Sequence, residues 1–72
     1  MNKFLDEMRS KGFNLYFCYM PETRKMRIMV TKRLKDVTKD FESTILNDEF
    51  GLRMSIRQMA DDLDKILERE KK

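Results

Sequence analysis

The stretch FNLYFCYM, residues 13–20, decides the fold of this 72-residue chain. It holds one polar residue, Asn14, although 40% of the chain is charged. Aromatic side chains favour β-strands, and successive side chains of a strand point to opposite faces of a sheet. Both faces of the expected strand are therefore apolar, and each needs cover from the chain or a partner.

A second β-prone run, KMRIMVTKR at residues 25–33, follows the short polar segment PETR. Pro21 suits the turn between the runs, because its ring fixes φ at a value that turns use. The runs predict an antiparallel hairpin over residues 13–20 and 25–33. Alternation directs one set of side chains to the core: Phe13, Leu15, Phe17, Tyr19, Met26, Ile28 and Val30. The opposite face carries Asn14, Tyr16, Cys18, Met20, Arg27, Met29 and Thr31.

Amphipathic helices are predicted at both ends of the chain. The first is short, presents Phe4, Leu5 and Met8 on one side, and stops at Gly12, which suits a left-handed helix end. The last carries a stripe of apolar residues with helical spacing: Ile56, Met59, Ala60, Leu63, Ile66 and Leu67. Ser55 followed by Gln58 forms a capping-box pattern and predicts the start of this helix. A start near Asp48 is the alternative, because Leu52 continues the stripe, although Gly51 argues against it.

The segment between the hairpin and the last helix has the weakest pattern. Val37, Phe41 and Ile45 recur every four residues, which predicts a short middle helix over residues 36–46. A third strand over part of residues 41–46 is the alternative. The fold class expected is α+β: an antiparallel β-hairpin packed against a C-terminal amphipathic helix, with a short N-terminal helix and a short middle helix.

The size of the chain supports one domain, placed at residues 1–72. A core this small contributes about 3–5 kcal/mol and is usually supplemented by disulfides, a metal or oligomerisation. Cys18 is the only cysteine and histidine is absent, so an intramolecular disulfide and the usual zinc sites are excluded. We therefore expect self-association, and we interpret Cys18 as a small packed hydrophobic residue.

Residue patterns that carry chemistry are nearly absent. The chain has no histidine for acid–base catalysis near neutral pH, no glycine-rich phosphate loop and no serine nucleophile motif. The prediction is a protein without enzymatic activity, cofactor or metal site. The acidic residues of the last helix are interpreted as a solvated face rather than a cation site: Asp61, Asp62, Asp64 and Glu68.

The longest apolar run, LYFCYM, is far shorter than the ~18 residues that cross a bilayer, and the N-terminus lacks a signal-peptide core. A soluble, cytoplasmic protein without membrane contact is therefore expected. Nine Lys and seven Met beside a single Ala are typical of AT-rich genomes. This composition is also common among small accessory proteins of phages and mobile elements.

Charge is unevenly distributed along the chain. Residues 1–39 carry ten Lys/Arg against four Asp/Glu, a net charge of +6, whereas residues 40–72 carry six against nine, a net charge of −3. Such asymmetry attracts acidic partners or steers two copies together. The leading hypothesis is a non-enzymatic interaction or regulatory protein that binds another protein, as a homodimer, through the second hairpin face. Its expected contact residues are Tyr16, Met20, Arg27 and Met29.

The alternative hypothesis is a nucleic-acid-binding accessory protein. Its contacts would come from the basic turn and second strand: Arg24, Lys25, Arg27, Lys32, Arg33 and Lys35. Cations along a ribbon neutralise phosphates, and an aromatic side chain such as Tyr16 can stack on a base. Basic residues on strand rims also prevent unwanted edge pairing, so the pattern is not specific.

Overall fold

The computed structural model describes residues 2–70 of the chain; residues 1, 71 and 72 of the predicted domain lie outside the described part. Its elements follow in the order α1 (Asn2–Ser10), β1 (Asn14–Met20), β2 (Lys25–Lys32), β3 (Lys35–Glu42), the 3-10 helix η1 (Ser43–Asn47) and α2 (Glu49–Glu70). The fold is therefore α+β, as predicted. Both predicted terminal helices and the hairpin are present.

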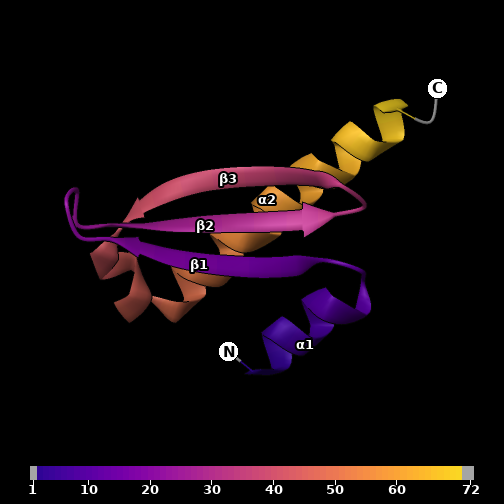
Figure 1. The fold of residues 1–72 in the computed structure, drawn as a ribbon. Helices are drawn as coiled ribbons and strands as arrows, with labels where there is room; N and C mark the ends of the chain where they lie inside the picture. The colour runs from indigo at the N-terminus through magenta and orange to yellow at the C-terminus, as the bar shows by residue number, and fades with distance from the viewer. Residues whose placement is uncertain (1, 71–72) are drawn as a thin grey trace.

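The three strands form one antiparallel sheet in the order β1-β2-β3. In register, Phe17 lies opposite Ile28, which in turn lies opposite Lys39. Both helices lie against the same side of this sheet (Figure 1), α2 across β2 and β3 and α1 beside β1. We call the side facing the helices the inner face and the opposite side the outer face.

The core lies between the inner face and the helices. Four side chains are almost completely buried, and they come from β2 and α2: Ile28, Val30, Ile56 and Leu63. The remaining buried apolar residues surround them: Phe4, Met8, Phe13, Met26, Leu52, Met59 and Ala60. The predicted stripe of the last helix is thus confirmed along most of its length, although Ile66 is 37% exposed.

The predicted middle helix is wrong. Residues 35–42 form strand β3, and only the five-residue 3-10 helix η1 follows it. A four-residue spacing fits both periodicities, because residues i and i+4 share a face of a strand as well as of a helix. Val37 and Phe41 accordingly lie on the inner face, half-buried against the core. The β-branched residues Val37 and Thr38 also favour a strand.

The start predicted for the last helix at Ser55 is wrong, and the alternative start near Asp48 is confirmed, because α2 begins at Glu49. The Asp48 carboxylate accepts a hydrogen bond from the backbone N–H of Gly51 at 3.0 Å, and the Asp48 carbonyl accepts one from Leu52 at 2.9 Å. A Cβ atom at position 51 would lie 2.5 Å from that carboxylate. Gly51 therefore leaves space for the N-cap, which explains a glycine in the first turn of this helix.

The helix end predicted at Gly12 is confirmed. Gly12 has φ +91°, its N–H bonds to the Arg9 carbonyl at 2.9 Å, and the N–H of Phe13 bonds to the Met8 carbonyl at 3.0 Å. These bonds form a Schellman motif, in which the residue after the glycine packs on the last helical turn. Phe13 and Met8 are both buried, so the motif fixes how α1 meets β1.

Candidate binding surface on the sheet

The outer face of the sheet is built from cross-strand rows. The register gives three successive rows: Tyr16, Met29 and Thr38; then Cys18, Arg27 and Asp40; then Met20, Lys25 and Glu42. Since α1 and α2 both pack on the inner face, no element within residues 2–70 covers these rows. Apolar side chains gather on β1 and β2, and carboxylates gather on β3.

The four residues predicted to contact a protein partner lie together on this face. Tyr16 and Met29 are direct cross-strand neighbours, and Met20 and Arg27 lie in the next rows along. Tyr16 is 53% exposed, while Met20 and Met29 are half-buried between neighbouring side chains. Cys18 is exposed on the same face, so its interpretation as a small packed hydrophobic residue is wrong. These side chains form an apolar strip, defined here as Tyr16, Cys18, Met20 and Met29.

Arg27 lies between the apolar residues of β1 and the outer-face carboxylates of β3, which we call the acidic strand. Its guanidinium donates to both carboxylate oxygens of Asp40, from Nε at 2.9 Å and from Nη2 at 3.3 Å. These charge-assisted bonds from Arg27 hold the pKa of the Asp40 carboxyl below its ordinary value, and the bond to Asp40 raises the pKa of Arg27. Two parallel bonds fix the plane of the guanidinium, so its position on the face is defined.

The carboxylates that β3 places on this face were not predicted from the sequence as part of the surface. Asp36, Asp40 and Glu42 occupy its outer positions, opposite Thr31, Arg27 and Lys25 of β2. These residues share one face only if residues 35–42 form a strand. The predicted helix would not have placed all three on one side. The presence of Val37 and Thr38 was the signal that could have identified the strand.

The six residues predicted to contact nucleic acid do not form one continuous ribbon. Arg24 and Lys25 lie at the β1–β2 turn, and Lys32, Arg33 and Lys35 lie at the β2–β3 turn, at the other end of the sheet. Lys32 points to the helix side, where its ammonium lies 3.0 Å from Asp64 and 4.5 Å from the centre of the Phe13 ring.

Ion pairs also engage part of this set. Lys35 lies 2.9 Å from Glu70, and that hydrogen bond raises the pKa of Lys35. Arg27 is held by Asp40. The β3 carboxylates share the outer face with Arg27 and would repel phosphates there. The arrangement therefore gives nucleic-acid binding less support than the sequence pattern did.

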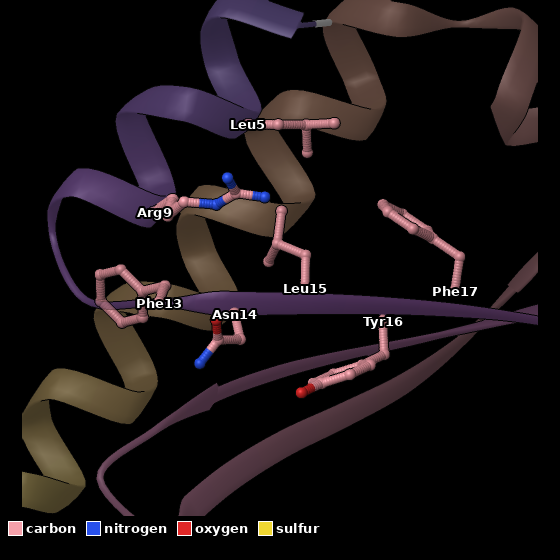
Figure 2. Close-up of a pocket in the computed structure, with 7 residues that line it drawn as sticks. All are labelled: Leu5, Arg9, Phe13, Asn14, Leu15, Tyr16 and Phe17. Atoms are coloured by element: carbon pink, nitrogen blue, oxygen red, sulfur yellow. The ribbon is translucent and has the colours of Figure 1, made fainter.

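The inner face has an uncovered part beneath β1. Phe17 and Tyr19 point to the helix side, as predicted, yet they are 42% and 51% exposed and do not belong to the buried core. The reason is that α1 covers only the start of β1, while α2 packs on β2 and β3. A groove of about 190 Å³ lies there, lined by Leu5 and Arg9 of α1 and by residues 13–17. Figure 2 shows Leu5, Leu15 and Phe17 around this space, with Tyr16 on the other side of the strand.

The acidic residues of α2 are spread along its exposed side. Asp64 pairs with Lys32, and Asp62 accepts a hydrogen bond from Gln58 at 3.1 Å. Within residues 2–70, no three acidic or cysteine side chains converge as a metal site would require. The same residues include no helix with the length and apolar character needed to cross a membrane. Comparison with protein-family models, curated proteins and solved structures gave no match for this chain.

Proposed function

We propose that the chain is a non-enzymatic interaction protein that binds another protein through the outer face of its sheet. The observation that carries the proposal is the placement of both helices on the inner face, which leaves the apolar strip without cover. An apolar patch rimmed by charged residues is typical of a protein-binding surface. The absence of histidine and of catalytic motifs from the sequence supports a role in binding rather than in catalysis.

The chemistry of the face indicates the kind of partner. Tyr16 offers a large aromatic surface, and the methionines of the strip adapt to irregular apolar shapes. Beside them stand Arg27 and the carboxylates of β3. A partner surface with apolar side chains at its centre and basic residues at one rim would complement this pattern, because the acidic strand lies on one side of the strip only.

The test compares one substitution at two exposed methionines. Met29→Asp places a charge in the apolar strip, whereas Met54→Asp places the same charge on α2, where Met54 is 51% exposed. Wild type and both variants are immobilised and exposed to a lysate of the source cells, and retained proteins are identified and then purified for calorimetry. The proposal requires a partner that binds wild type and Met54→Asp and binds Met29→Asp at least about tenfold more weakly. Tyr16→Asp serves as a second variant if Met29→Asp does not fold.

Two outcomes oppose the proposal. Equal binding of the purified partner to all three proteins places its contact away from the outer face. Tight binding of labelled single- or double-stranded DNA or RNA, with an affinity that falls steeply with salt, supports the basic residues instead. In that case Lys32→Ala with Arg33→Ala should weaken the complex, and Met29→Asp should not.

A further inference from the structure

The two edges of the sheet differ sharply in charge. Strand β1 has seven residues, NLYFCYM, without a charge, a proline or a glycine. Strand β3, KDVTKDFE, has five charged residues among eight. At the same level of the inner face, β1 presents Phe17 and β3 presents Lys39. Charged side chains protect an edge from pairing with another strand, so β3 is protected and β1 is not.

The uncovered inner face lies beneath this unprotected edge. Phe17 and Tyr19 are exposed on the helix side of β1. Phe17 lines the groove together with Leu5 of α1. A strand added beside β1 would therefore gain backbone hydrogen bonds along the edge and apolar contacts below it. In the described part of the chain nothing occupies that position.

We propose that a second copy of the chain occupies this position, through antiparallel pairing of β1 with the β1 strand of the second copy. The occupant must be an extended, uncharged segment with apolar side chains on both faces, and β1 itself has this composition. With Phe17 on the two-fold axis, Tyr16 lies opposite Cys18 of the second copy, and Leu15 lies opposite its Tyr19. No charge meets a charge across the seven residues, and one patch serves both copies, as a two-fold interface requires.

Self-pairing would join the two sheets into one of six strands. It would shield Phe17 and Tyr19, which the small core leaves exposed. It would also place the apolar strips of the two copies side by side on one continuous outer face. The inference goes beyond the proposed function and does not depend on it, because the edge and the outer face are different surfaces.

The dimer can be tested in the wild-type chain through its single cysteine. The proposed register puts the two Cys18 residues about 8 Å apart, two positions from direct opposition on adjacent strands. A short bis-maleimide should therefore join two chains at micromolar concentration. Hydrogen exchange of the β1 amides should slow as protein concentration rises, while exchange at β3 should not change. Sedimentation should show a species of twice the 8.8 kDa chain mass.

A variant pair tests the edge directly. Phe17→Lys places a charge on the axis, and Leu34→Lys adds the same charge at the β2–β3 turn, where Leu34 is fully exposed. Phe17→Lys should raise the dimer dissociation constant at least about tenfold, because it removes an aromatic pair and opposes two like charges. Leu34→Lys should leave it unchanged. Circular dichroism checks that both variants fold. If Phe17→Lys does not fold, Tyr19→Lys is used in its place.

Several results would overturn the inference. A wild-type chain that stays monomeric at hundreds of micromolar would leave the edge to an extended segment of another protein. A dimer that persists in Phe17→Lys, or whose β1 amides exchange at a rate independent of concentration, would place the interface elsewhere. None of these results bears on the Met29→Asp comparison, so failure of this inference and failure of the proposed function are separable.

Discussion

Arg27 and Asp40 face each other across β2 and β3 and are joined by two hydrogen bonds on the outer face of the sheet. Both side chains are partly exposed, at 50% and 36%. The pair links β2 to β3 and fixes the position of the Arg27 guanidinium next to the apolar strip. The protonation of Asp40 therefore reports whether this contact with Arg27 is formed.

We expect Asp40 to titrate below the ordinary aspartate range, because Arg27 stabilises its carboxylate form. A pKa lowered on folding stabilises the native state above the ordinary aspartate value of about 3.9 and loses that effect as pH falls through the native value. Carboxyl-carbon NMR measures the pKa of Asp40 in the folded protein. Arg27→Gln should raise the pKa of Asp40, whereas Lys35→Gln, which removes the cation paired with Glu70, should not. An unchanged Asp40 titration in Arg27→Gln would contradict the assignment.

The β2–β3 turn should be improved by substitution. Arg33 and Leu34 have φ values of +52° and +67°, a pattern in which Asn-Gly is preferred and in which other residues are strained. Replacing them by Asn and Gly should raise the free energy of unfolding by about 1–2 kcal/mol, as judged from the cost of left-handed backbone. Thermal denaturation should show a higher midpoint, by roughly 4–8 °C for each kcal/mol. A lower midpoint would show that the turn is not strained.

Truncation of the core should unfold much of the protein. Ile56 is completely buried at the centre of the helix–sheet contact. Ile56→Ala should cost about 2–5 kcal/mol, which approaches the ~3–5 kcal/mol expected from a core of this size. Met54→Ala, on the exposed side of the same helix, should stay within about 0.5 kcal/mol of wild type. Urea denaturation distinguishes the two, and equal effects would contradict the packing described.

The N-cap of α2 should contribute measurably. Asp48→Ala removes the carboxylate that accepts from the Gly51 N–H and should cost about 1 kcal/mol in urea denaturation. Asp48→Asn keeps a side-chain oxygen and should recover most of that loss. A neutral Asp48→Ala, combined with a destabilising Ser55→Ala, would instead favour a helix that starts near Ser55.

The parts of the fold predicted correctly are those with a single consistent periodicity. Alternation over residues 25–33 fits only a strand, and the stripe through Ile56 and Leu63 fits only a helix. The helix predicted over residues 36–46 was wrong because the spacing of Val37 and Phe41 fits both the helical and the strand period. The start of α2 predicted at Ser55 was wrong because the capping-box pattern there resembles a helix start, whereas the cap is Asp48. The Asp48 carboxylate can bond the Gly51 N–H only because residue 51 has no Cβ atom.

The candidate surface was partly predictable for a related reason. Alternation places Tyr16, Met20, Arg27 and Met29 on one face, and the structure confirms that placement. It could not reveal that Asp40 pairs with Arg27, because that contact requires the third strand. Nor could it show that Phe17 would stay exposed on the inner face, since exposure depends on where α1 ends in space.

The sequential order of the strands also bears on how rapidly the chain folds. Each strand pairs with its neighbour in the sequence, and β2 and β3 are joined by a turn of only two residues, Arg33 and Leu34. Such local pairings require little loop closure before contacts form, which favours rapid folding. We expect the β2–β3 hairpin and α2 to assemble first around Ile28 and Ile56, with β1 and α1 joining last.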